Sequence, residues 1–451
     1  MDAWFDEING SSREGPFIAK KIIILISSII LFAFTLPSLV PAQDKFIQDI
    51  IEKAAPGDQI KLDEGQYDEE IVIDKPIHLI GGEETTFIQK NKNPVITINA
   101  DHVTLENLSI IHEDDYNHSA AILINSDNNT LQRITIHTTS YGIQLDEANK
   151  NKIYDVTITG DQDKPMNERK HGIDLWKSNN NEIYDSSISH VQDSIYIEKS
   201  NNTRLFNNQT FHSRYGTHLM FTKNTVLEQN ESYENVSGFY VMGAHNTVIK
   251  NNTLKNNREN VQSIGLFVFD TKNATITNNQ IENNRIGFFL EDAEDNSFTF
   301  NNVQNNYVGI QFKKAKNNVL THNAFVANIV QGQALESNHN TTNENYWGDH
   351  LGLDMHGQNM SSLPYKVDPF FMSVINEYPV FQLLFQSPGM VFLEDLIQIP
   401  VDVQLVDASP LMTHPLVVTK NKPSHQLAIL FLCFSLLLIS IMIIYLGVRK
   451  Q

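Results

Sequence analysis

The sequence repeats itself with a period close to 22 residues, and this repeat limits the possible fold more than any other feature. Small residues recur as anchor positions. Five of the seven intervals between anchors are 22 residues long, and the other two are 30 and 27. The anchors are Gly142, Gly172, Ser194, Gly216, Gly238, Gly265, Gly287 and Gly309. A fixed period of this length is typical of a solenoid, in which each repeat forms one coil.

Apolar residues alternate within each repeat. The first and third residues after the anchor are apolar in nearly every coil, as in Ile173 and Leu175, and another apolar position follows eleven residues after the anchor, as in Ile183. Alternation over short segments predicts strands. A coil of about 22 residues then predicts an all-β, single-stranded, right-handed parallel β-helix with three sides. Equivalent positions of successive coils would stack at the ~4.8 Å spacing of neighbouring strands.

Two columns of asparagine support this fold. The first column contains Asn180, Asn202, Asn224, Asn246, Asn273 and Asn317, with Asp295 in one coil. The second contains Asn208, Asn230, Asn252, Asn279, Asn301 and Asn323. Asparagine tolerates left-handed backbone conformations at turns, and stacked amides can bond from coil to coil. We therefore predict that both columns form turn ladders.

The segments around the repeat predict export and a membrane tether. Lys20 and Lys21 precede an apolar run that ends before Ala42, as in a signal sequence, although an uncleaved anchor is the alternative. The uncharged stretch Leu427–Val448 is long enough to cross a bilayer, and basic residues follow it. The predicted parts are an N-terminal extension and signal sequence (1–42), the β-helix with a cap at Ile47–Ile60 (43–345), a Trp-containing cap segment (346–372), a docking tail (373–425) and a transmembrane helix (426–448). The β-helix would then lie outside the cytoplasm.

Charge and cysteine content exclude several classes of function. The net charge of −20 argues against nucleic-acid binding, because no basic stripe is available for phosphates. The single cysteine, Cys433, lies in the C-terminal apolar run. The exported part therefore has no disulfide framework, thiolate zinc site or thiol nucleophile.

The second and fourth residues after each anchor should point outward, and in the middle coils they form an apolar patch. The predicted partner-binding residues on this face are Trp176, Tyr196, His218, Met220, Tyr240, Met242, Phe267, Phe269 and Phe289. Two longer repeats would place loops, Thr159–Lys170 and roughly Lys255–Gln262, along its edge. An exposed apolar patch usually marks a partner surface. The alternative is that a loop or the C-terminal tail covers it.

Three residues of this patch could also contact a metal. His218, Met220 and Met242 lie on neighbouring strands, and imidazole with thioether sulfur suits Cu(I). No firm cofactor is predicted, and a transient Cu(I) contact is the hypothesis for these residues. The competing interpretation is an adaptable protein-binding surface without metal.

The sequence offers little for catalysis, although solenoids of this type often process polysaccharides. Hydrolysis of a glycosidic bond needs two positioned carboxylates, whereas Asp146, Asp174 and Glu198 lie on successive coils near the acidic end of the face. His171 with Asp174 is the best cluster available. We therefore predict no enzymatic activity and no catalytic residues.

Several motifs together resemble the NosD family of extracytoplasmic accessory proteins in nitrous oxide reductase maturation. They are Arg214 to Met220, Gly238 to Met242, Asn345-Tyr346-Trp347-Gly348-Asp349, Pro364-Tyr365, Ser387 to Met390 and Asp407 to Met412. The resemblance covers about residues 45–415. One departure is His356-Gly357-Gln358-Asn359, which stands where the family has a stretch resembling Asp-Gly-Asp-Gly and puts a cation site there in doubt.

The resemblance implies a non-catalytic scaffold that helps deliver copper or sulfur to the copper–sulfide cluster of nitrous oxide reductase. Its implied partners are an ABC transporter permease and ATPase, the reductase, and a copper chaperone, with Tyr378–Leu396 packing on the membrane component. The alternative from another class is a cell-surface β-helix that binds or cleaves carbohydrate.

Overall fold

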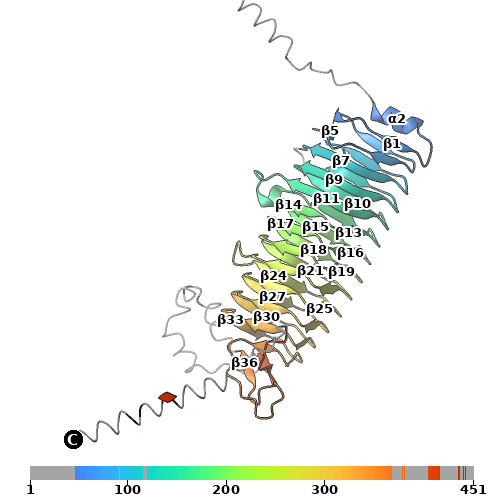
Figure 1. The fold of residues 1–451 in the computed structure, drawn as a ribbon. Helices are drawn as coiled ribbons and strands as arrows, with labels where there is room; N and C mark the ends of the chain where they lie inside the picture. The colour runs from blue at the N-terminus through green and yellow to red at the C-terminus, as the bar shows by residue number, and fades with distance from the viewer. Residues whose placement is uncertain are drawn as a thin grey trace, which may run out of the picture. The chain divides into compact units, whose positions relative to one another are not determined.

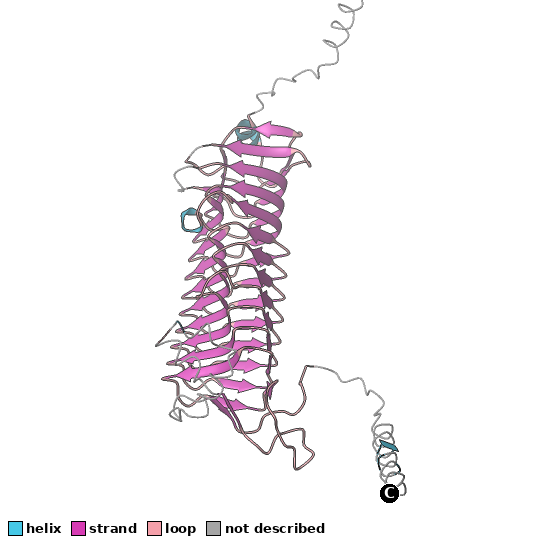
Figure 2. Cartoon of the chain, turned by 90° about the vertical axis from the view of Figure 1, so that its left-hand side faces the viewer, coloured by secondary structure: helices cyan, strands magenta, loops and turns pink. Residues whose placement is uncertain are grey.

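The computed structural model describes residues 46–90, 92–114, 119–367, 378, 380, 405–416, 435, 436, 440 and 442. Most of them form a parallel β-helix, in which each strand pairs with the equivalent strand of the next coil (Figures 1 and 2). The strands lie in a 12-stranded sheet and a 23-stranded sheet, and the larger one folds around two faces. The predicted three-sided parallel solenoid is therefore confirmed.

The bounds of the strands follow the repeat. The 12-stranded sheet contains β3 (Ile71–Ile73), β6 (Ile96–Ile98), β8 (Ala120–Ile124), β10 (Tyr141–Asp146), β12 (Ile173–Trp176), β15 (Asp193–Glu198), β18 (Tyr215–Met220), β21 (Ser237–Met242), β24 (Ile264–Phe269), β27 (Ile286–Glu291), β30 (Val308–Lys313) and β33 (Val330–Leu335). One face of the larger sheet contains β1 (Gln59–Lys61), β4 (His78–Ile80), β13 (Glu182–Tyr184), β16 (Arg204–Phe206), β19 (Val226–Glu228), β22 (Val248–Lys250), β25 (Thr275–Thr277), β28 (Ser297–Thr299), β31 (Val319–Thr321) and β34 (Thr341–Asn343). The other contains β2 (Gly65–Tyr67), β5 (Thr85–Gln89), β14 (Ser187–Ser189), β17 (Gln209–Phe211), β20 (Glu231–Tyr233), β23 (Thr253–Lys255), β26 (Gln280–Glu282), β29 (Asn302–Gln304), β32 (Ala324–Val326) and β35 (Tyr346–Trp347). Three long strands, β7 (Thr104–His112), β9 (Thr130–Thr138) and β11 (Lys152–Gly160), belong to both faces.

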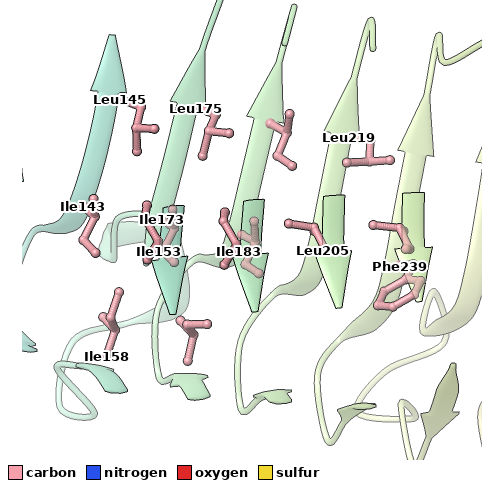
Figure 3. Packing of buried hydrophobic residues seen from close by; sticks show 14 of the residues in the cluster. Ile143, Leu145, Ile153, Ile158, Ile173, Leu175, Ile183, Leu205, Leu219 and Phe239 are labelled. Carbon is pink, nitrogen blue, oxygen red and sulfur yellow. The ribbon is translucent and has the colours of Figure 1, made fainter. Parts of the chain in front are cut away.

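The core fills the interior of the coils with aliphatic and aromatic side chains. Ile143 and Leu145 of β10 and Ile153 of β11 have at most 1% of their surface exposed. Figure 3 shows equivalent side chains of successive coils stacked in rows, for example Ile143 beside Ile173. The inward positions predicted from the alternation are therefore confirmed. Burial of these rows along the whole stack is the main source of stability.

The asparagine columns form ladders, but only one of them uses the left-handed backbone. Asn180 and Asn202 of the first column have φ angles of 60° and 57°. In the second column the residue before the asparagine takes this conformation, as Asn251 does before Asn252. Asn252 is instead buried: its Nδ2 donates to the carbonyl of Leu227, and its Oδ1 accepts from the backbone N–H of Asn230. The left-handed explanation was therefore wrong for the second column.

A further buried ladder was not predicted from the sequence. It consists of Asn235, Asn257, Asn284, Asn306 and Asn328. Each amide of this ladder satisfies backbone groups of neighbouring coils, as Asn284 does for the N–H of Asn257 and the carbonyl of Leu254. Buried backbone groups need such partners, because the turns between strands cannot supply them.

Each end of the β-helix is covered. Helix α2 (Ile47–Lys53) buries Ile47 and Ile51 against the first coils, which confirms the predicted N-terminal cap. At the other end Trp347 stacks between the rings of Phe325 and Tyr365. Strand β36 (Tyr365–Val367) pairs with β37 (Leu405–Asp407) in antiparallel fashion. Asp407 accepts hydrogen bonds from the backbone and side-chain N–H groups of Asn345 and from Nε1 of Trp347.

The segments predicted to target and anchor the protein lie mostly outside the described residues. The signal sequence (1–42) lies outside the described residues, as do most of Tyr378–Leu396 and all but four residues of the transmembrane segment (426–448). Among the residues that are described, no helix is long and apolar enough to span a membrane. The two inserted loops are present after β11 and β23, and the first contains the short 3-10 helix η1 (Met166–Glu168).

Candidate functional site

The outward side of the 12-stranded sheet, called the outer face below, carries two rows of side chains in register. The first row runs through Gln144, Asp174, Tyr196, His218, Tyr240, Phe267, Phe289 and Gln311. The second runs through Asp146, Trp176, Glu198, Met220, Met242, Phe269, Glu291 and Lys313. These are the residues expected from the repeat, so the nine predicted site residues do share one face.

The aromatic part of this face is less exposed than the sequence suggested. His218 and Phe267 are buried, with exposed fractions of 6% and 5%. Phe267 packs between Tyr240 and Phe289, with ring centroids 4.6 and 5.1 Å apart. The other predicted site residues are partly buried. The expectation of an exposed patch is corrected here: neighbouring coils bring large rings so close that they cover one another.

A buried carboxylate, Asp193, organises the centre of the outer face. It is fully buried at the start of β15. Arg214 donates to both of its oxygens, through Nε at 2.8 Å and Nη2 at 2.7 Å. Burial alone would raise the pKa of Asp193, but hydrogen bonds from His218 and Arg214 outweigh it and lower the pKa. Asp193 is therefore an anion that fixes its two partners in place.

His218 is held against this carboxylate with one nitrogen left over. Its Nδ1 lies 2.8 Å from Oδ2 of Asp193, and its Nε2 is buried without a hydrogen-bond partner. A carboxylate only accepts, so Nδ1 donates, and the neutral ring then carries its lone pair on Nε2. This arrangement is the one that orients histidine as a metal ligand or a base.

Three tyrosines enclose the imidazole. The rings of Tyr196, Tyr215 and Tyr240 approach His218 edge-to-face, with centroids 5.0, 5.1 and 5.4 Å away. Tyr215 also stacks on Tyr240 at 4.1 Å. We call Asp193, Arg214, His218 and these tyrosines the Asp193 cluster. The rings keep water from Nε2, which explains its lack of a partner.

Met220 adjoins the Asp193 cluster through Tyr196. The Tyr196 hydroxyl lies 2.8 Å from Oε2 of Glu198 and 3.1 Å from the sulfur of Met220. Met220 is in register with Met242 of the next coil. The structure thus brings together all three residues of the copper hypothesis on adjacent strands, with His218 and Met220 two residues apart on β18. Among the described residues, no three His, Cys, Asp or Glu side chains form a metal site.

The acidic end of the face contains two further perturbed groups. His171 stacks on Tyr196 at 4.5 Å, and burial lowers its pKa to about 4, with Asp193 opposing this effect. Burial raises the pKa of Asp174 to about 7, although a hydrogen bond with Gln144 opposes the increase. Both groups are therefore neutral more readily than usual.

Asp193, Arg214 and Tyr215 were not predicted as site residues. Asp193 and Tyr215 stand one position before the anchors Ser194 and Gly216, and Arg214 stands two before. The outward positions predicted from the repeat all follow the anchor. The sequence did contain a signal for Asp193. The other coils have residues without a carboxylate at this offset, and a carboxylate that is buried in the stack needs a partner.

A family model covers the part of the chain that contains the Asp193 cluster. Residues 154–352 match the family model described as "Periplasmic copper-binding protein (NosD)". This match confirms the resemblance to the NosD family that the sequence motifs carry. The match includes the whole Asp193 cluster and both methionines. Residues 83–209 match the right-handed β-helix region, which establishes the predicted hand of the solenoid. No curated protein matches the chain.

Solved structures with a similar fold include several carbohydrate-active proteins. A mannuronic acid-specific polysaccharide family 6 lyase from human gut microbiota has a TM-score of 0.53 and 15% identity, covering 69% of this chain and 86% of its own. The Yersinia enterocolitica family 28 exopolygalacturonase has a TM-score of 0.51 and 10% identity, covering 65% and 74%. At such identities the likeness shows the β-helix fold alone.

Proposed function

We propose that this protein is a non-catalytic, extracytoplasmic scaffold that assists copper or sulfur delivery to the copper–sulfide cluster of nitrous oxide reductase. The description of its family as periplasmic and copper-binding supports the compartment and the metal. The observation that carries the proposal is the buried, unpartnered Nε2 of His218 beside Met220, inside the matched region.

Copper is the cargo in this proposal, and the donor set fits Cu(I). An imidazole nitrogen and thioether sulfurs are soft ligands, and Cu(I) accepts the low coordination number that His218, Met220 and Met242 would offer. Asp193 fixes the ring so that Nε2 keeps its lone pair. Because tyrosine rings cover Nε2, a side chain such as Tyr196 must rotate before copper can reach it. Cargo transfer would then depend on a docked partner.

The partners proposed are those of the family resemblance. A copper chaperone and the reductase would dock on the partly buried rings and methionines beside the Asp193 cluster, since aromatic and methionine side chains are favoured at protein interfaces. The ABC transporter permease and ATPase would lie at the C-terminal end, and residues 426–448 would tether the chain to the membrane.

A carbohydrate-active β-helix is the alternative, and Asp174 is the observation that favours it. A carboxyl group with a pKa of about 7, in register with Tyr196 of the next coil, is suited to general acid catalysis. However, cleavage by hydrolysis needs a second positioned carboxylate, and Asp193 is already bonded to Arg214 and His218.

The deciding experiment measures nitrous oxide reduction by whole cells that lack this protein, together with the copper content of the purified reductase. The proposal expects reductase to be made without its copper–sulfide cluster and to be restored by the wild-type gene. A fully loaded, active reductase in the deletion strain would contradict the maturation role and direct attention to polysaccharides.

Complementation with variants then tests the site. Met220→Leu combined with Met242→Leu removes two sulfurs while preserving volume. The double variant is expected to leave the reductase poorly loaded. Met166→Leu, in the loop after β11, is the matched control and should complement fully. Immunoblots of exported protein show whether each variant is produced.

A further inference from the structure

The loop Leu351–Leu363, called the C-terminal loop below, exposes an unusual number of apolar side chains. It follows β35, the last strand of the solenoid, and in Figure 1 the orange chain around β36 extends beyond the stack. The exposed fractions are 92% for Leu351, 53% for Leu353, 66% for Met355 and 49% for Leu363. A soluble surface does not need such a cluster, so it indicates an apolar partner.

The charge of this loop also differs from that of the inserted loop between β23 and β24. The segment between β23 and β24 contains Arg258 and Glu259 and exposes one large apolar residue, Val261, by 73%. The C-terminal loop has no lysine or arginine, and its one acidic residue is Asp354. The carboxylate of Asp354 accepts four backbone N–H groups, from His356, Gly357, Gln358 and Asn359. These four bonds stabilise the carboxylate within the loop itself.

Hydrogen bonds hold the C-terminal loop against residues 405–416. Ser361 donates its N–H to the carbonyl of Pro410, and the N–H of Met412 donates to the carbonyl of Asn359. Thr413 adds a side-chain bond to Asn359 at 2.9 Å. The apolar side chains are therefore presented on an ordered support beside residues 405–416.

The length of the following chain limits how far the loop can lie from a bilayer. Ten residues separate Leu416 from Leu427, where the uncharged stretch 427–448 begins. They span about 40 Å when fully extended. If residues 427–448 cross the membrane, the C-terminal loop is thus held within about one bilayer thickness of the lipid surface.

We propose that the C-terminal loop inserts Leu351, Leu353 and Met355 into the interfacial region of the bilayer that holds the C-terminal segment. The proposal rests on the tether in the proposed function, and it does not depend on the copper role. The loop is a second contact that sets the orientation of the β-helix on the membrane. Apolar side chains gain free energy by leaving water there, and the internally bonded Asp354 adds little cost.

The test places an environment-sensitive dye on the full-length chain in vesicles of phosphatidylcholine and phosphatidylglycerol. Cys433→Ala removes the single natural thiol. Met355→Cys carries the dye in the loop, Leu351→Cys provides a second reporter, and Val261→Cys is the exposed control. We expect emission from both loop positions to shift to shorter wavelength, and spin-labelled lipids to quench it several-fold more than at position 261.

The outcomes separate this proposal from the tether. If the chain floats with vesicles but all three dyes respond alike to spin-labelled lipid, the tether stands and the loop proposal fails. If the chain does not float, both fail. If the loop dyes shift only when a purified permease is added and lipids never quench them, the loop binds a membrane protein and the lipid proposal is overturned.

Discussion

The buried asparagine ladders and the outer face run along the same coils. The ladders repeat one residue type from coil to coil, whereas the outer face changes its residue type. From Asn208 to Asn323 each coil repeats one amide with the same bonds to its neighbours. On the outer face the first row changes from Gln144 through His218 to Phe289. A solenoid repeats what every coil needs for stability. Positions that differ between coils are free to carry function, so the irregular face is the place to search for the site.

The largest expected effect comes from Asp193, the buried carboxylate that Arg214 and His218 share. Asp193→Ala leaves Arg214 and His218 without their common partner, and removing one member of a buried pair costs about 3–5 kcal/mol. Chemical denaturation of the purified chain measures this loss. Asp146→Ala, an exposed carboxylate on the same face, should change stability by under about 0.5 kcal/mol. Equal effects of the two variants would contradict the central role of Asp193.

A somewhat smaller loss is expected from one ladder position. Asn279→Ala removes the acceptor of the Asn252 N–H and the donor to the Ile249 carbonyl, both buried. Two unsatisfied groups cost about 2–4 kcal/mol, which denaturation midpoints would show. Gln280→Ala, the exposed next residue, is the control. A negligible cost at Asn279 would mean that water replaces the amide. The ladder positions would then be no more important for stability than those of the outer face.

The third prediction concerns pH and Asp174. The pKa of Asp174 is raised from 3.8, the ordinary value of an aspartate, to about 7 in the folded protein. The fold therefore favours the neutral acid. This stabilisation is complete below pH 3.8 and is lost as the pH rises through 7. The full difference corresponds to about 4 kcal/mol, and partial solvent access reduces the expected effect to about 1–2 kcal/mol. Asp174→Asn should therefore be the more stable form at pH 8 and gain nothing at pH 4, as denaturation at both values would show. Parallel pH curves would show that Asp174 is charged throughout.

The smallest change in stability is expected at the two methionines. Replacing both Met220 and Met242 with leucine conserves volume and should cost under about 1.5 kcal/mol. Cu(I) affinity, measured by competition with a coloured chelator, should fall at least ~tenfold, or about 1.4 kcal/mol. Met166→Leu should leave both quantities unchanged. Unchanged copper affinity in the double variant would contradict the Cu(I) hypothesis. The outer face would then be a protein-docking surface without metal.

The sequence predicted the fold well because the repeat places each residue without long-range information. Offsets from the anchors gave the buried rows and the register of His218 with Tyr240. The offsets could not predict which side chains of the outer face are buried. The exposure of His218, for example, depends on how tyrosine rings from three coils pack around it. Asp193 was missed for a related reason: its role arises from Arg214, 21 residues away, which bonds across coils.

The C-terminal cap has a consequence for how one chain avoids joining another. Each ladder amide both accepts and donates, so an open end would offer a template on which a further chain could add coil after coil. Asp407 accepts the bonds of Asn345 and Trp347 in the place where the next asparagine would stand. A carboxylate has no N–H to pass on. This ladder therefore ends in a group that accepts hydrogen bonds and donates none, and together with the β36–β37 pair it closes the edge to the addition of another chain.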